Sequence, residues 1–246
     1  MQALIDDAVE ILEGRGGLLL SCEHASNRIP DPVTLSEADQ PWLDTHWAWD
    51  PGAPTVLRHL VRRCDATAVL ARFSRLLCDA NRSIDDPTWI VGNIEGHDLS
   101  FNRRVPAEER RRRQDHYYAP YHSALDVAAN LVAERATPLL LSIHSFTPVY
   151  LGQRRSMELG ILFDDHEELA EAFSSSLTEQ GFSVAMNEPY SGREGRMYSA
   201  TRHGSGNGLP YLELELRQDL GETEAEWARV ADRVLNALRA AGLVAP

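Results

Sequence analysis

Hydrophobic residues occur in short runs that alternate with longer amphipathic segments. The runs, each bounded by polar residues, occupy residues 17–22, 67–72, 138–143, 159–163 and 211–217. Segments with helical spacing occupy residues 54–63, 107–135, 165–180 and 223–241. This alternation is typical of βαβ units. It predicts an α/β fold with three αβα layers and a mostly parallel mixed sheet.

Two segments depart from this simple pattern. Residues 190–208 are rich in serine and glycine and show no apolar period, which predicts a long loop, and such loops are often functional. Residues 110–113 are four arginines that follow two glutamates inside the helical segment 107–135. Mixed charge of this kind is typical of a solvated helix face with ion pairs.

Length and composition indicate an ordinary globular protein. The chain has 246 residues, of which 43% are hydrophobic and 25% charged, and we expect one domain spanning residues 1–246. No apolar run is long enough to cross a membrane, and the N-terminus lacks the basic start of a signal peptide. We therefore expect a soluble, cytoplasmic protein, with monomer and homodimer both open.

Charge and cysteine content exclude several function classes. The net charge of −13 disfavours nucleic acids and anionic membranes as partners. All 24 basic residues are arginines, which excludes Schiff-base, P-loop and lysine-base chemistry. Cys22, Cys64 and Cys78 have no CxxC spacing, so neither a disulfide framework nor a cysteine-rich zinc site is indicated. Buried thiols are expected, with a nucleophilic Cys22 as the less favoured alternative.

Two histidines directly follow buried strands. His24 comes after the run 17–22 and His144 after the run 138–143. If both strands are parallel, these side chains lie at the edge of the sheet where α/β proteins bind ligands. A single histidine after a strand is more often a cap or a hydrogen-bonded core residue. Two in matching positions favour a metal site with imidazole ligands.

A carboxylate is needed to complete such a site. Catalytic Zn²⁺ often takes two histidines and one acid, and leaves a position for water. The candidates are Asp50, before a Pro-Gly turn, and Glu23, beside the first histidine. Adjacent residues of an extended strand point to opposite faces, which counts against Glu23 unless the chain turns there. We favour Asp50; Asp44 and His46 are further options that capping or loop roles would explain equally well.

Arginines follow the run 67–72. Arg75 and the pair formed by Asn81 and Arg82 could be ordinary surface residues. In a strongly acidic protein, an Asn-Arg pair after a strand suits bidentate binding of a substrate carboxylate. We therefore expect a small anionic substrate.

The last strand alternates apolar and acidic residues. Glu213 and Glu215 share one face, which is either the solvated face of an edge strand or a face turned into the active-site crevice. In the second case, one glutamate is the general base for a metal-activated water. Alternation cannot choose between the two. Glu215 is nearer the C-terminal end of the strand, where the other candidates lie, and is our choice.

Several short motifs together resemble the N-formylglutamate amidohydrolase family. In order along about residues 18 to 220, they are SCEHASNRIP, WDPGA, SRLLCDANRS, LLLSIHSFTPVY, GILFD, NEPYSG and LELRQDL. The chain is similar to a divergent branch, because it reads CEHAS and SIHSF where more typical members read PHSG and DCHSM.

The resemblance implies a zinc-exopeptidase-like (phosphorylase/hydrolase-like) α/β fold. It also implies hydrolysis of an amide on an acidic amino acid, which releases formate and glutamate in the type reaction. Zn²⁺ would be held by two histidines and one acid, with a glutamate base on a late strand and an Asn-Arg pair for the substrate carboxylate. These roles map onto His24, His144, Glu215, Asn81 and Arg82.

The sequence therefore predicts a metal-dependent amidohydrolase that cleaves an N-formyl or N-acyl amide of an acidic amino acid. Two other functions remain open. One is a metal-free serine hydrolase that uses Ser145 or Ser26, although the chain has no GxSxG motif. The other is a non-catalytic sensor that binds an acidic metabolite through Arg75 and Arg82.

Overall fold

A mixed sheet forms the centre of the computed structural model, which describes residues 3–245. Its eight strands lie in the order β1-β2-β4-β3-β7-β12-β10-β11. They are β1 (Ala3–Ile5), β2 (Val9–Leu12), β3 (Leu18–Cys22), β4 (Thr67–Ala71), β7 (Leu139–Phe146), β10 (Leu159–Leu162), β11 (Val184–Met186) and β12 (Tyr211–Arg217). The central strands β4, β3, β7 and β12 are mutually parallel, whereas β2 and β10 join them antiparallel.

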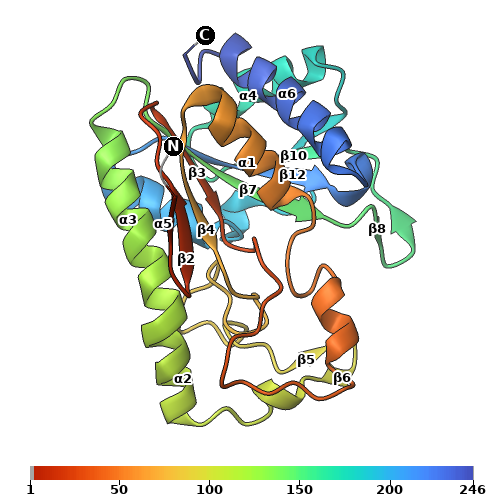
Figure 1. Ribbon diagram of the computed structural model, residues 1–246. Helices are drawn as coiled ribbons and strands as arrows, with labels where there is room; N and C mark the ends of the chain where they lie inside the picture. Colours follow the sequence, from red (N-terminus) through yellow and green to blue (C-terminus); the bar gives the residue numbers. More distant parts are fainter. Residues whose placement is uncertain (1–2, 246) are drawn as a thin grey trace.

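Helices cover both faces of this sheet (Figure 1). One core packs beneath α1 (Ala53–Cys64), α4 (Glu167–Glu179) and α6 (Glu224–Ala240), and a second packs beneath α3 (Ala119–Ala133) and α5 (Tyr198–Asn207). In α1, the buried residues Val56, Leu57, Leu60 and Val61 follow the spacing of one helix face. The three-layer α/β architecture expected from the sequence is confirmed.

Shorter elements lie mostly in the connections. Two small hairpins pair β5 (Asn93–Ile94) with β6 (His97–Asp98) and β8 (Val149–Tyr150) with β9 (Gln153–Arg154). Single turns of 3₁₀ helix occur at Gln40–Asp44, Ser100–Asn102, Gly192–Glu194 and Gln218–Leu220. The loops that follow β3 and β4 gather at one end of the molecule, in the lower part of Figure 1. Within residues 3–245, no helix is both long and apolar enough to cross a membrane.

The predicted helix at 107–135 forms, with an interruption. It comprises α2 (Ala107–Arg113), a π-helical turn at Gln114–Tyr118, and α3. The turn precedes Pro120, which has no N–H to donate to the preceding turn of a regular α-helix.

The solvated-face interpretation of residues 110–113 is wrong for Arg113, which is buried. Its guanidinium donates to the carbonyl oxygens of Leu77 and Phe101 at 2.8 and 2.9 Å and to Asn102 Oδ1 at 2.6 Å. Burial is therefore compatible with its charge, because the donors have partners. Arg110 and Arg111, in the same run, are exposed as expected.

The long loop predicted at 190–208 is also corrected, because most of its second half is helix α5. The buried face of α5 consists of Ser199, Ala200, His203 and Gly204, which follow helical spacing but carry little apolar surface. A Cβ atom on Gly204 would lie 2.2 Å from the ring of Tyr211. This glycine is therefore present for close packing against β12, and not for a turn.

Candidate functional site

Three side chains converge at the carboxyl ends of β3 and β7. These strands are parallel neighbours, which confirms the condition on which the pairing of His24 and His144 depended. The Nδ1 atoms of the two histidines lie 3.1 Å apart. Asp50 Oδ2 is 2.9 Å from His144 Nδ1 and 3.3 Å from His24 Nδ1. All three side chains are buried.

The other ring nitrogen of each histidine faces a carboxylate. His24 Nε2 is 2.8 Å from Asp79 Oδ1, and His144 Nε2 is 3.0 Å from Glu23 Oε2. In a neutral imidazole, the nitrogen that faces a carboxylate carries the proton, so the opposite nitrogen carries a lone pair. Two lone pairs and a carboxylate oxygen then point at one another, an arrangement that a cation between them would stabilise.

This donor set fits a divalent metal such as Zn²⁺. Imidazole nitrogen and carboxylate oxygen are ordinary zinc ligands, and bonds of about 2.1 Å in a tetrahedral site place neighbouring ligand atoms about 3.4 Å apart. The separations of 2.9 to 3.3 Å in this cluster are close to that spacing. His24, Asp50 and His144 are the residues of the described chain whose ligand atoms group in this way.

Asp50 is placed by the turn that the sequence predicted. Its backbone N–H donates to the carbonyl of His24 at 2.9 Å, and its Oδ2 accepts from the backbone N–H of Ser145 at 3.2 Å. Gly52, two residues on, has a φ of 86° and packs so closely on Trp227 that a Cβ atom would lie 2.3 Å from the ring. The short connection into α1 thereby fixes the carboxylate between the two histidines.

Glu23, the other candidate for the third ligand, lies on the far side of His144. Its carboxylate accepts from Tyr121 Oη at 2.8 Å and Ser142 Oγ at 2.7 Å as well as from the histidine. Burial alone would raise the pKa of Glu23, but His144 and the Ser142 hydroxyl hold it well below the usual range. Glu23 is therefore an ionised partner that orients His144.

The cluster carries excess negative charge. Burial alone would lower the pKa of His144, yet Glu213, Asp50 and Glu23 together raise it well above its ordinary value. Arg75 balances part of the charge, because its Nη2 lies 2.9 Å from Asp79 and its Nη1 3.8 Å from Asp50. A bound cation would balance more.

A cavity of about 310 Å³ opens beside these residues. Its lining comprises His24, His46, Trp47, Asp50, Arg75, Asn81, Arg82, His144, Ser145, Phe146, Thr147, Tyr150, Tyr190, Arg196, Glu213 and Glu215. Most candidates from the sequence thus lie in one place. The exceptions are Glu23, which stands behind His144, and the less favoured candidates Asp44, Ser26 and Cys22, none of which lines the cavity.

The two glutamates of β12 are buried, so the edge-strand alternative is wrong. β12 lies between β7 and β10, with Glu215 opposite His144 and Glu213 opposite Ser142. Burial raises the pKa of Glu213 to about 8 and that of Glu215 to about 7. The Oε2 atom of each glutamate has no hydrogen-bond partner among the described residues.

Their surroundings differ. Glu213 lies 3.5 Å from His144 Nε2, on the side away from the converging ligand atoms. The charged groups that act on Glu215 include Asp50 and Arg75, which line the cavity. Glu215 is therefore the better placed of the two to meet a substrate.

The family model for N-formylglutamate amidohydrolases matches residues 16–221. The chain belongs to this family. The resemblance inferred from its motifs is therefore confirmed.

Two solved structures and one curated protein are similar to this member of the N-formylglutamate amidohydrolase family. A gene product of Agrobacterium tumefaciens superposes with a TM-score of 0.86 at 35% identity, over 96% of this chain and 95% of the other. An N-formylglutamate amidohydrolase from Ralstonia eutropha JMP134 gives 0.71 at 21% identity, over 97% and 98%, and so shares the fold. An N-formylglutamate deformylase from Pseudomonas putida is 30% identical over 173 residues, which are 63% of this chain and 63% of that protein.

In this family member, Asn81 has a different set of contacts from the one expected. Its Oδ1 accepts from the backbone N–H of Ser199 at 2.9 Å, and its Nδ2 donates to the carbonyl of Arg196 at 3.3 Å. Both polar atoms of the amide therefore hold the segment that begins α5. Arg82 lines the cavity, with Nη1 donating to the Asn81 carbonyl at 2.8 Å.

The alternative nucleophiles are poorly placed. Ser145 Oγ accepts from Gln218 at 3.2 Å, and Ser26 Oγ accepts from the backbone of Arg28 at 3.1 Å. Neither hydroxyl has a hydrogen bond to a histidine within residues 3–245. Cys22 is fully buried, and burial raises the pKa of its thiol.

As for the further metal candidates, His46 lines the cavity without joining the cluster, and Asp44 is exposed.

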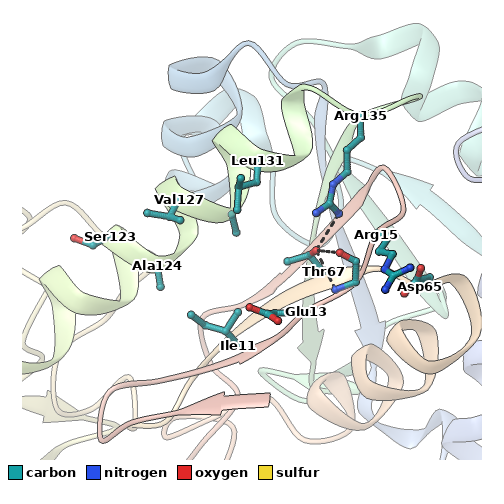
Figure 2. A pocket seen from close by; sticks show the side chains of 12 residues that line it. Ile11, Glu13, Arg15, Asp65, Thr67, Ser123, Ala124, Val127, Leu131 and Arg135 are labelled. Atoms are coloured by element: carbon teal, nitrogen blue, oxygen red, sulfur yellow. Dashed lines mark hydrogen bonds between the residues drawn. The ribbon is translucent and has the colours of Figure 1, made fainter. Parts of the chain in front are cut away.

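A larger cavity of about 870 Å³ lies elsewhere, between α3 and the end of the β2 and β4 strands (Figure 2). Val127 and Leu131 of α3 form its exposed apolar side. Arg135 crosses it and donates to Thr67 Oγ1 at 3.2 Å. Its lining contains no histidine or cysteine.

Sequence reasoning missed Asp79, Tyr121 and Arg196. Asp79 lies inside the motif CDANRS, between the chosen residues Arg75 and Asn81, and its position after a strand was an available signal. Tyr121 and Arg196 belong to segments distant in sequence from the strand ends, and no local pattern connects them with the cluster.

Proposed function

We propose that this protein is a metal-dependent amidohydrolase that removes a formyl or similar small acyl group from an acidic amino acid. The supporting observation is the convergence of His24 Nδ1, His144 Nδ1 and Asp50 Oδ2 within 3.3 Å, beside the unpartnered carboxylate of Glu215. The name of the P. putida relative, N-formylglutamate deformylase, supports N-formylglutamate as the first substrate to test.

His24, His144 and Asp50 would hold the metal, with Asp79 and Glu23 fixing the two imidazole rings. When bound, Zn²⁺ supplies a Lewis acid that polarises an amide carbonyl and makes a water molecule more acidic. His24, Asp50 and His144 all line the cavity, so a metal that they held would be within reach of the amide of a substrate bound there.

Glu215 would move the protons. Its pKa of about 7 suits a group that must take a proton at Oε2 from the attacking water and then give it to the leaving nitrogen. The carbonyl carbon gains the water oxygen and loses the amide nitrogen. The products are a carboxylic acid, formate in the simplest case, and a free amino acid.

Arg82 would bind the carboxylate next to the amide nitrogen. It lines the cavity and has no carboxylate partner among the described residues, so its guanidinium is available for a charge-assisted bond. Arg75 is less available, because Asp79 and Asp50 already flank it. Its role in this proposal is to balance the charge of the metal site.

The direct test is formate release from N-formyl-L-glutamate, with N-acetyl and N-succinyl glutamate for comparison. The purified protein should lose activity when chelated and regain it with Zn²⁺. Glu215→Gln should keep the metal and lose at least about 100-fold in kcat, whereas Glu194→Gln, on the exposed segment before α5, should not. Glu213→Gln should be affected less than Glu215→Gln.

Three outcomes would contradict the proposal. Activity that survives complete chelation would favour the serine hydrolase. Tight binding of acyl-amino acids without turnover would favour the sensor. Full activity of Glu215→Gln together with an inactive Glu213→Gln would move the base to Glu213.

A further inference from the structure

We infer that Arg196 binds a second carboxylate of the substrate, the one at the end of its side chain, and thereby makes the site selective for dicarboxylic acyl-amino acids. This inference rests on the proposed function and assigns a specificity-determining residue within it.

Arg196 is a cation at the edge of the cavity and has no ion-pair partner within residues 6–245. It is exposed, yet it lines the same cavity as Glu215. No carboxylate within residues 6–245 forms an ion pair with it, and its guanidinium makes no hydrogen bond there. In a chain with 37 acidic residues and a net charge of −13, a cation left without a carboxylate at an active site is available for an anionic ligand.

The backbone of Arg196 is nevertheless fixed. Its carbonyl accepts from Asn81 Nδ2 at 3.3 Å, and Asn81 Oδ1 accepts from Ser199 N at 2.9 Å. Asn81 is the immediate neighbour of Arg82. The Asn81 side chain thus connects the segment that carries Arg82 with the segment that carries Arg196. These hydrogen bonds set the distance between the two backbone segments.

The two arginines lie at different depths. Arg82 is half-buried and close enough to Asp79, the partner of His24, to contribute to lowering the pKa of that carboxyl. Arg196 is at the exposed rim. In an N-acyl amino acid, the α-carboxylate is close to the amide nitrogen, and a side-chain carboxylate is further away. The inner cation therefore suits the α-carboxylate, and the outer cation suits the side chain.

Acidic side chains in the lining of the cavity favour a second cation for a substrate with two carboxylates. Asp50, Glu213 and Glu215 all line the cavity, and a dianion would be repelled by any of these that are ionised. Pairing each carboxylate of the substrate with its own guanidinium offsets this repulsion.

Arg155 is another arginine close to the cavity, and the side chains around it indicate a structural role. Its guanidinium lies 5.0 to 5.4 Å from the ring centres of Phe146, Tyr150 and Tyr190, and Nη1 donates to the carbonyl of Thr147 at 3.2 Å. Its charge reaches Glu215, but its side chain does not line the cavity.

The test compares N-formyl-L-glutamate with N-formyl-L-glutamine, which has the same shape but lacks the side-chain charge. Arg196→Gln should lower kcat/KM for the glutamate substrate by about 10-fold or more, mainly through KM, and change the glutamine substrate by less than about twofold. Arg193→Gln is the matched control, because Arg193 lies three residues away and pairs with Glu167 at 2.9 Å. Arg82→Gln should impair both substrates.

The possible results distinguish a failure of the proposed function from a failure of the inference about Arg196. If the wild-type protein hydrolyses neither substrate in its metal-loaded form, the proposed function fails. If the wild-type protein is active but Arg196→Gln affects both substrates equally or neither, the inference about Arg196 is overturned. A loss confined to the glutamate substrate in Arg155→Gln, with Arg196→Gln unaffected, would overturn it as well.

Discussion

His24 and His144 turn their Nδ1 atoms toward each other at 3.1 Å while each Nε2 faces its own carboxylate. Two neighbouring histidines in a protein core would normally share a proton between their facing nitrogens. They would not need a carboxylate beside each of the other two ring nitrogens. Here the outer acids, Asp79 and Glu23, fix both rings so that their free nitrogens meet at Asp50 Oδ2. The arrangement therefore fits a metal site whose three candidate ligands are already oriented.

The outer carboxylates yield the first prediction. Asp79→Asn and Glu23→Gln should each weaken metal binding by about 10- to 100-fold, because each imidazole loses the charged acceptor that fixes its orientation and raises its basicity. Competition with a chromophoric chelator measures this affinity. Asp85→Asn, at an exposed position in the same loop as Asp79, is the control. Unchanged affinity in both outer-carboxylate variants would show that the rings are held by other contacts.

A second prediction concerns the glycines of α5. Gly204→Ala should lower the free energy of unfolding by about 1 to 3 kcal/mol, because the added Cβ would meet the ring of Tyr211 at 2.2 Å. Gly206→Ala, two residues on in the same helix with nothing within 4 Å of a Cβ, should raise it by up to about 1 kcal/mol. Urea denaturation of the pair measures both. Equal effects of the two substitutions would contradict the packing explanation.

A third prediction follows from a buried histidine pair that joins α3 to α5. His203 Nδ1 donates to Asp126 at 2.6 Å, and His122 Nδ1 then donates to His203 Nε2 at 2.7 Å. Burial, with the nearby charges of His203 and Arg202, lowers the pKa of His122 from 6.5 to about 3. The folded protein thus keeps His122 neutral over a range in which the unfolded chain protonates it.

The sign of the pH effect follows from this difference. Between pH 6.5 and about 3, the unfolded state binds more protons, so the free energy of unfolding falls as the pH falls. A single such group contributes at most about 1.4 kcal/mol per pH unit. His122→Gln should therefore have a shallower loss of stability from pH 6.5 to 5 than the wild type, with His116→Gln, an exposed position, as control. Parallel pH profiles for His122→Gln and the wild type would refute it.

Much of the fold and the centre of the site could be predicted from the sequence. The runs that form β3 and β7 are strongly apolar, and polar residues begin near their ends, so the placement of His24 and His144 follows from parallel pairing. Glu213 and Glu215 were recognised because alternation with leucine puts them on one face. In these segments, local sequence and tertiary position are directly related.

The features that were missed depend on contacts between distant segments. Arg113 is buried because carbonyl groups near residues 77 and 101 accept its donors, and nothing in its own run of arginines indicates this. α5 was missed because its buried face is made of small residues that fit against Tyr211. Asn81 is recognisable as a functional position, but only the fold shows that its amide holds the backbone of Arg196.

The metal content of purified protein tests the central claim most directly. Elemental analysis should find about one divalent metal ion per chain in the wild type. His24→Ala and His144→Ala should lose it while circular dichroism shows that both remain folded, and His46→Ala, which alters the same cavity without touching the cluster, should retain it. Stoichiometric metal in both His24→Ala and His144→Ala would contradict the account.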